Sequence, residues 1–164
     1  MKIIYHCYGG AHSSVTAANI HLGLLPADRF PGYDEIKGQK FFDLHGASDI
    51  GKIYFMGRDS FGNNIYILGR RSRPTLVYSV TRVIEDAFEI DPGSYMLVDV
   101  SPHVNLAMKI GGFLSRKMNL TYIGRPIVTW GTVRTYDGIL KLVEMIKSQT
   151  NPDNSSNKSY SGDK

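Results

Sequence analysis

The chain has 164 residues, of which 42% are hydrophobic and 21% are charged, and its formal net charge is +4 at pH 7. These values fit one soluble globular domain, while the small charge excess lacks the long basic stripe typical of nucleic-acid-binding proteins. The single cysteine, Cys7, excludes an internal disulfide, and no apolar run is long enough to cross a membrane, so we expect a cytoplasmic protein.

Hydrophobic spacing and turn residues divide the chain into alternating strands and helices. The predicted elements, in chain order, are a strand ending at Cys7, a helix from Ser13 or Ser14 to about Leu24, a short helix within 33–42, strands at 52–56 and 64–68 joined by the loop 57–63, a helix from Pro74 to about Ala87, a strand at 95–98, a helix starting at Ser101, strands at 120–123 and 127–130, and a helix at 136–148.

Several of these elements have distinct boundary signals. Ser101 followed by Pro102 is typical of a helix start, because serine caps the first turn and proline fits it. The run 95–98 is uninterrupted and apolar, which favours a strand buried on both faces. The C-terminal residues are polar and aperiodic, so we predict a domain at 1–149 and a disordered tail at 150–164.

The alternation of strands and helices predicts a single three-layer α/β domain with a mostly parallel sheet and an added β-hairpin. Ligands of such folds bind where loops leave the carboxyl ends of the strands. The loops 7–14 and 99–103 both follow predicted strands. If those strands are neighbours in the sheet, the two loops face one site.

The first hypothesis for the opening loop is a phosphate or nucleotide site. A strand, a glycine pair, two serines and a helix follow one another here, an order that aims backbone N–H groups at an anion. The candidate ligand-binding residues of this loop are Gly9, Gly10, His12, Ser13 and Ser14.

The loop and the sequence Ala-Ala-Asn-Ile that follows it resemble the opening of the deviant P-loop ATPases that partition chromosomes and place division sites. The segment 95–102, an apolar run ending in Asp99 near a proline, is similar to their second motif. In this alignment Ser13 replaces the phosphate-binding lysine, and Ser14 takes the magnesium-hydroxyl position. The resemblance implies a P-loop-like layout in which Asp99 faces the site. Arg58, Arg70, Arg71 and Arg73 are the candidate replacements for the missing cation, and Arg70 is the one included among the predicted site residues.

The second hypothesis is a thiol enzyme. His6, Cys7, Gly10 and Ser14 form a string similar to the cysteine phosphatase signature, in which a thiolate attacks phosphorus from within a nest of N–H groups. A cysteine before a helix N-terminus tends to be activated as a nucleophile, so Cys7 is the candidate catalytic residue of this hypothesis, for which no partner aspartate is nominated. Asp99, which faces the site under the first hypothesis, is the other candidate catalytic residue. The arginine that clamps phosphate in that signature is Ser13 here.

The third hypothesis is a non-catalytic interaction protein in which Cys7 is a core residue and the serines only cap a helix. Under all three hypotheses no metal site is predicted, since the spacing of His6, Cys7 and His12 matches no zinc pattern. The cofactor is unknown. The expected partner is a phosphate-bearing small molecule, or a protein under the third hypothesis.

The opening His-Cys-Tyr-Gly-Gly string, the sequences Phe-Met-Gly at 55–57 and Ile-Leu-Gly-Arg at 67–70, and the segment 111–116 resemble a family of unknown function. Its members are small proteins of Gram-positive, largely spore-forming bacteria. The resemblance implies a cytoplasmic bacterial protein with a link to sporulation, and it supplies no activity.

Overall fold

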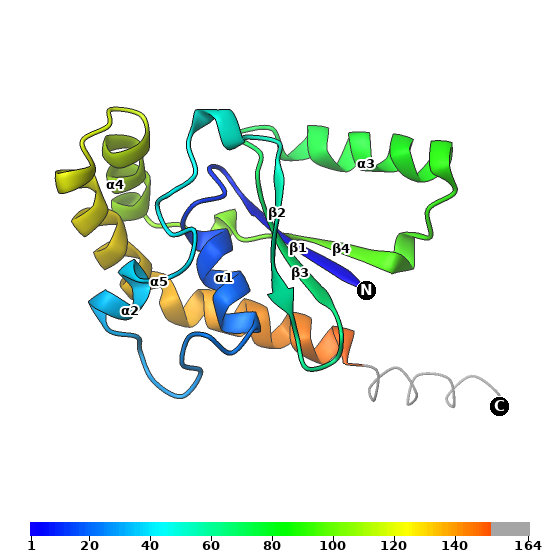
Figure 1. Ribbon diagram of the computed structural model, residues 1–164, viewed down its shortest axis with the longest axis horizontal. Helices are drawn as coiled ribbons and strands as arrows, with labels where there is room; N and C mark the ends of the chain where they lie inside the picture. Colours follow the sequence, from blue (N-terminus) through cyan, green and yellow to red (C-terminus); the bar gives the residue numbers. More distant parts are fainter. Residues whose placement is uncertain (152–164) are drawn as a thin grey trace.

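A computed structural model describes residues 1–151 of the chain (Figure 1). The predicted tail therefore lies mostly outside the described residues. The described part is an α/β fold with one four-stranded sheet and five helices. These elements are β1 (Lys2–Cys7), α1 (Ser13–His21), α2 (Tyr33–Lys37), β2 (Ile53–Arg58), β3 (Asn64–Gly69), α3 (Pro74–Phe88), β4 (Tyr95–Asp99), α4 (Leu106–Arg116) and α5 (Thr121–Thr150).

The sheet has the strand order β2-β3-β1-β4. β1 lies between β3 and β4 and is parallel to both, while β2 and β3 form an antiparallel hairpin at one edge. The expected parallel core with an added hairpin is therefore confirmed. Because β1 and β4 are neighbours, the loops that follow them leave the same end of the sheet.

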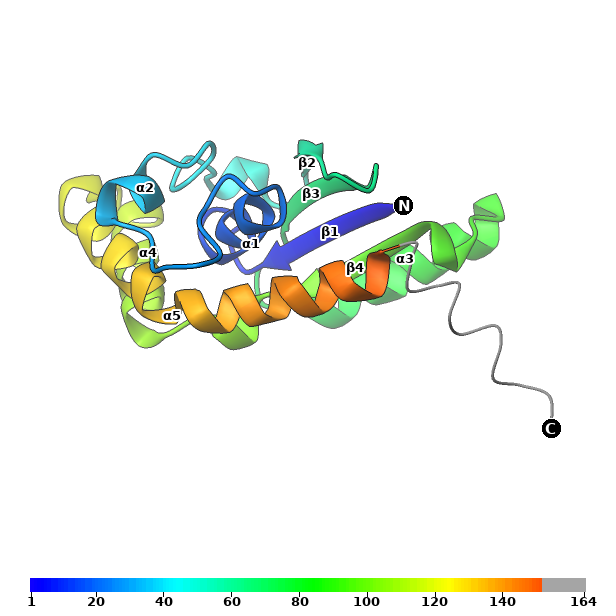
Figure 2. The same cartoon turned by 90° about the horizontal axis from the view of Figure 1, so that it is seen from below.

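One face of the sheet carries the hydrophobic core. Ile3, Tyr5, Ile65 and Ile67 are fully buried and belong to one cluster with residues of α1 and α5. All nine residues of α1 are buried, which fits a helix that is enclosed on every side. Figure 2 shows α1 beside β1, and the long helix α5 passing alongside both of them.

The other face of the sheet is covered much less. Among the helices of residues 1–151, α3 alone lies on this side, and none of its residues is fully buried. Figure 1 shows α3 standing apart from the other helices. In β4 only Val98 is buried, so the expectation of a strand buried on both faces is wrong. β4 is an edge strand, and the helix that would cover its second face is loosely packed.

The two strands predicted at 120–123 and 127–130 are absent, because both segments belong to the single helix α5. The local β-propensity of these residues is overridden by packing against α4. A Cβ on Gly111 would lie 2.4 Å from the backbone N of Val128, and one on Gly124 would lie 2.3 Å from that of Ser115. The glycines let two helix backbones touch, and this contact fixes the helical hairpin.

The helix predicted to start at Ser101 also begins later. Residues Ser101–His103 form a single 3₁₀ turn, and α4 starts at Leu106. Asn105 is the true cap, because its side chain accepts a hydrogen bond from the Met108 N–H at 2.9 Å. The Ser101 hydroxyl instead accepts a hydrogen bond from Arg70, so this side chain does not cap a helix.

Candidate functional site

The loop between β1 and α1 lies directly over the end of β3. Gly10 has a φ of +66°, and a Cβ there would lie 2.6 Å from the backbone N of Gly69. The N–H of Arg70 donates to the Cys7 carbonyl at 3.0 Å and that of Arg71 to the Tyr8 carbonyl at 2.8 Å. Glycine at position 10 is therefore required by close backbone packing, and the loop is held rigidly against the sheet.

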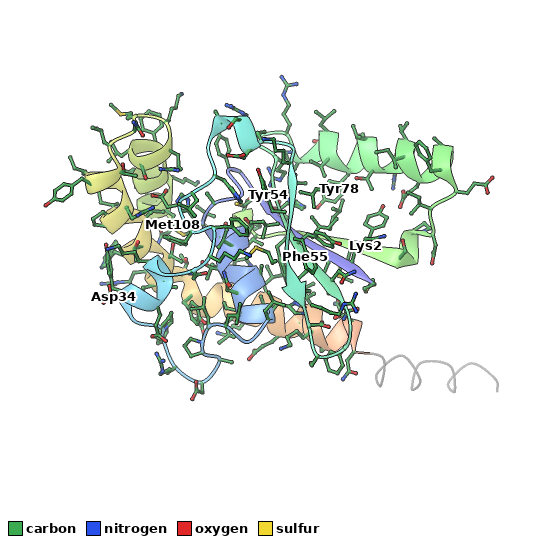
Figure 3. All side chains as sticks on the ribbon, in the orientation of Figure 1. Lys2, Asp34, Tyr54, Phe55, Tyr78 and Met108 are labelled. Atoms are coloured by element: carbon green, nitrogen blue, oxygen red, sulfur yellow. The ribbon has the colours of Figure 1, made fainter. Side chains whose placement is uncertain are left out.

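A cavity of about 740 Å³ opens beside this loop. It lies between the loop, the chain that follows β3 and helix α4, and Met108 of α4, labelled in Figure 3, is one of its lining residues. Five of the eight residues predicted for the site line this cavity: Cys7, Gly9, His12, Ser13 and Arg70. Gly10, Ser14 and Asp99 lie next to lining residues without lining the cavity themselves.

Cys7 lies at the carboxyl end of β1 and is 5% exposed. Its Sγ accepts a hydrogen bond from the Gly10 N–H at 3.3 Å and lies 3.2 Å from the Ser14 hydroxyl oxygen. Ser14 thus contacts the thiol rather than the cavity. The thiol sits in the curve of the loop with polar hydrogens around it.

Ser13 is the first residue of α1 and is 1% exposed, yet it lines the cavity. Within residues 1–151 its hydroxyl has no hydrogen-bond partner, and the backbone N–H groups of His12, Ser13 and Ser14 have no acceptor. Unpaired N–H groups at a helix N-terminus carry partial positive charge. The amino end of α1 therefore presents donors beside a cavity that has room for an acceptor.

Asp43 is the centre of a polar cluster at the same end of α1. Its side chain is fully buried and accepts hydrogen bonds from His12 Nε2 at 2.9 Å and from Ser115 Oγ at 2.6 Å. The Nε atoms of Arg116 and Arg125 each lie 3.2 Å from its oxygens. Burial by itself would raise the pKa of this carboxyl, but the hydrogen bonds and the Arg116 charge together lower it.

The sequence offered no signal for Asp43, which has a positive φ in the irregular segment before β2. Its role depends on donors from α1, α4 and α5 that are far apart in the chain. The buried Nε of Arg116 lies near the carboxylate but outside hydrogen-bond geometry. Asp43 therefore fixes the position of Arg116 at the cavity wall by charge more than by a hydrogen bond.

Arg70 and Asp99 form an ion pair at the end of β3 and β4. One terminal nitrogen of Arg70 donates to both Asp99 oxygens and to the Ser101 hydroxyl, each at 2.9 Å. Burial by itself would raise the pKa of Asp99. The hydrogen bonds from Ser101 and Arg70 lower it by more, so the pKa lies below its usual value. The Nε of Arg70 donates to His6 Nδ1 at 2.9 Å, so the neutral His6 carries its proton on Nε2. Burial lowers the pKa of His6.

Four further cationic groups line the cavity, and of these the sequence analysis had considered only Arg71, as a possible replacement for the missing cation. Arg71 comes from the chain after β3, and Lys109, Arg116 and Lys117 come from α4 or its end. Lys109 and Arg116 are seven residues apart and so share a helix face, a signal that was readable in the sequence. With Arg70, five cationic side chains line the cavity, and no carboxylate of residues 1–151 does.

A second histidine–carboxylate pair lies at the opposite end of α1, inside the core. His21 Nδ1 is 2.7 Å from the Tyr5 hydroxyl, and its Nε2 is 3.0 Å from Asp59. Burial lowers the pKa of His21, and burial together with the Asp59 charge raises that of Tyr5. Asp59 also accepts the N–H groups of Phe61 and Asn63 in the hairpin turn, so this cluster ties α1 to the β2–β3 hairpin.

Within residues 1–151 no group of three histidine, cysteine or carboxylate side chains is arranged to hold a metal ion. None of the helices in this part of the chain has the length and apolar character needed to cross a membrane.

Comparison with known proteins gives one match. A family model described as "Protein of unknown function (DUF3189)" matches residues 2–148. No curated protein and no solved structure gives a significant match.

Proposed function

The chain belongs to the DUF3189 family of proteins of unknown function, so its function has to be inferred from the site itself. We propose that the protein binds a phosphate-bearing small molecule in the cavity beside the β1–α1 loop. The observation that carries this proposal is the charge of the wall. In the part of the chain that the structure describes, five cationic side chains and no carboxylate line the cavity, and Ser13 at the amino end of α1 also lines it. Such a wall selects an anion.

The phosphate binds at the start of α1, where the backbone N–H groups of residues 12–14 have no acceptor within the described chain and the Ser13 hydroxyl is unpartnered. Helix N-termini bind phosphate through such groups together with the helix dipole. Arg71, Lys109 and Lys117 have no ion-pair partner among residues 1–151 and supply the mobile positive charge. Arg70 and Arg116 are fixed by Asp99 and Asp43 and supply charge from the wall.

The remaining lining residues define the rest of the ligand. Ile50, Val104, Met108 and Phe113 contribute apolar side chains to the cavity. A volume of about 740 Å³ lies in the range of small-molecule and cofactor sites. The ligand is therefore an anion with an apolar or aromatic part, and a nucleotide is the class that fits both features.

Binding without turnover fits the wall better than phosphoryl transfer. Ser13 stands where both related loop types place a cation against the transferred phosphate, and a hydroxyl cannot offset the charge that develops there. No carboxylate of the described residues lines the cavity to protonate a leaving group.

The test is isothermal titration of the full chain with ATP, GTP, AMP and inorganic phosphate. We expect at least one nucleotide to bind, and Lys109→Glu to weaken it by about tenfold because it reverses a charge at the wall. Lys37→Glu on α2 is the matched control: it makes the same charge change at an exposed residue outside the lining and should change the affinity less than about twofold.

Two outcomes would overturn the proposal. The first is that none of the four compounds gives a binding heat while the protein is folded by circular dichroism. The second is that Lys109→Glu and Lys37→Glu weaken binding equally. The net charge of the protein, rather than contacts in the cavity, would then explain the binding.

The contacts of Cys7 favour a second candidate, a thiol-dependent phosphatase. Its Sγ lines the cavity and lies among the Gly10 N–H and the Ser14 hydroxyl, as a thiolate nucleophile requires. Under this hypothesis the protein hydrolyses para-nitrophenyl phosphate, Cys7→Ser removes the activity, and iodoacetamide labels Cys7 below neutral pH. Ligand binding that survives Cys7→Ser without hydrolysis by the wild type would favour the binding proposal.

A further inference from the structure

The sheet presents a second apolar face that the chain leaves partly open. The strand register places Phe55, Tyr66, Ile4 and Leu97 in one row across all four strands. None of the four is fully buried, whereas the neighbouring row on the other face belongs to the core. Parallel sheets in globular proteins are normally covered on both faces. Within residues 1–151 this sheet therefore lacks a cover over part of its second face.

Helix α3 lies on the same side and presents an apolar stripe of exposed side chains, none of which belongs to the buried core cluster of residues 1–151. Leu76, Val80, Val83 and Ile84 follow helical spacing and, with Phe88, are 42–74% exposed. The partly covered residues, Pro74, Val77, Thr81 and Glu85, form the adjoining side of the helix, and Val77 lies between Ile84 and Phe88 at the edge of the stripe. Tyr78 projects toward the sheet and bonds His6 Nε2 at 3.2 Å (Figure 3), and Glu85 accepts from the Tyr95 hydroxyl.

We propose that this surface, formed by the α3 stripe and by Ile53 and Phe55 of β2, is the interface of a symmetric homodimer. Seven large apolar side chains that are about half exposed leave roughly 700 Å² per chain, close to the ~800 Å² that each partner contributes to a standard interface. An apolar patch of this size on a monomer marks an interaction site.

The charges at the two ends of α3 indicate that the occupant is a second copy. Arg71 and Arg73 precede the helix, whereas Asp86, Glu89 and Asp91 lie at or beyond its last turn, and all five are exposed. Two α3 helices that pack antiparallel across a twofold axis bring the basic end of one chain against the acidic end of its partner. Arg73 and Glu89 lie equally far in sequence from Thr81, so the axis passes near the middle of the stripe.

The experiment is sedimentation velocity and equilibrium on the full chain at low salt. We expect a concentration-dependent dimer, and Val83→Glu to abolish it, because it places a charge in the centre of the apolar stripe. Circular dichroism and the melting temperature of Val83→Glu report whether the variant folds, and Val83 is 66% exposed, so no core contact is lost.

A charge exchange tests the antiparallel arrangement independently of the apolar contact. Arg73→Glu and Glu89→Arg should each raise the dimer dissociation constant by about tenfold, and the double variant should restore it to near the wild-type value. A wild-type chain that stays monomeric at its highest soluble concentration would overturn the proposal and assign the surface to a different partner. A dimer that survives Val83→Glu, or a double variant weaker than both single ones, would also overturn it.

Discussion

The two ends of helix α1 carry the same pair of side chains in different surroundings. At the amino end His12 bonds Asp43, and two arginines join the carboxylate beside a cavity. At the carboxyl end His21 bonds Asp59, but the other donors are a tyrosine and neutral groups of a turn, and both side chains are sealed in the core. One short helix therefore has a cluster with two arginines beside a cavity at its amino end, and at its carboxyl end a buried carboxylate that is hydrogen-bonded only by uncharged donors.

This difference separates a functional role from a structural one. The Asp43 cluster neutralises its cations only in part, so positive charge remains at the cavity wall, where an anion can bind. The Asp59 cluster satisfies every strong donor within reach and connects α1, β1 and the hairpin. A histidine–carboxylate pair by itself therefore indicates neither a functional nor a structural role. The neighbouring charges and the access to a cavity distinguish the two roles.

The largest effect is expected from Asp59→Ala. It leaves His21 and the side chain and N–H of Asn63 without an acceptor in buried surroundings, and it also removes the acceptor of the exposed Phe61 N–H. Three buried donors left unsatisfied should together reduce the free energy of unfolding by about 3–5 kcal/mol, measured by urea denaturation. Nucleotide affinity of the folded fraction should stay unchanged. A loss below about 1 kcal/mol would contradict the structural role.

Asp43→Ala is the matched change at the other end of α1. Its arginine partners are 25% and 31% exposed and can be rehydrated, so the expected loss of stability is smaller, about 2 kcal/mol. Removing a negative charge beside the cavity should also strengthen nucleotide binding severalfold, measured by calorimetry. If Asp43→Ala left the affinity unchanged while Asp59→Ala altered it, the proposed division of roles would be reversed.

The pH dependence of stability should report the sealed histidine. Burial lowers the pKa of His21, so below about pH 6.5 the unfolded chain binds a proton that the folded chain does not. Stability should therefore fall as the pH drops from about 7 to 5, by at most ~1.4 kcal/mol per pH unit for each such histidine. His21→Asn should remove part of this slope. His6, whose pKa is lowered in the same direction, retains the rest.

Both carboxylates act in a different pH range. The pKa values of Asp43 and Asp59 are lowered in the folded chain, so the stability they provide is present above the unfolded pKa of about 4 and lost only at lower pH. A slope between pH 7 and 5 that survives unchanged in the His21→Asn variant would show that this histidine is not its source.

The smallest effect is expected from Arg125→Gln. Arg125 contacts Asp43 but does not line the cavity, and its side chain is 31% exposed. The pair should contribute no more than about 1 kcal/mol to the free energy of unfolding, because Asp43 keeps its other three partners. Nucleotide affinity should change less than about twofold. An effect on affinity equal to that of Lys109→Glu would extend the site beyond the cavity.

The sequence predicted the strand, loop and helix at the start of the chain because the signals are local: a β-rich run, glycines and an amphipathic or alanine-rich segment. The hairpin at 52–68 and helix α3 are confirmed for the same reason. The segment 120–130 was predicted wrongly, since its β-forming residues are helical only in contact with α4. The glycine contacts that hold the two helices together, at Gly111 and Gly124, join residues whose pairing no local pattern shows.

The sequence by itself determined that a loop rich in small and polar residues follows the first strand, and that the chain carries more cations than carboxylates. Only the tertiary structure decided what surrounds that loop. It brought Arg71 from the chain after β3, and Lys109 and Arg116 from α4, to one cavity wall, and it buried Asp43 beside Arg116. Burial and charge at a point depend on distances between segments remote in the chain, and those distances exist only after the helices have packed.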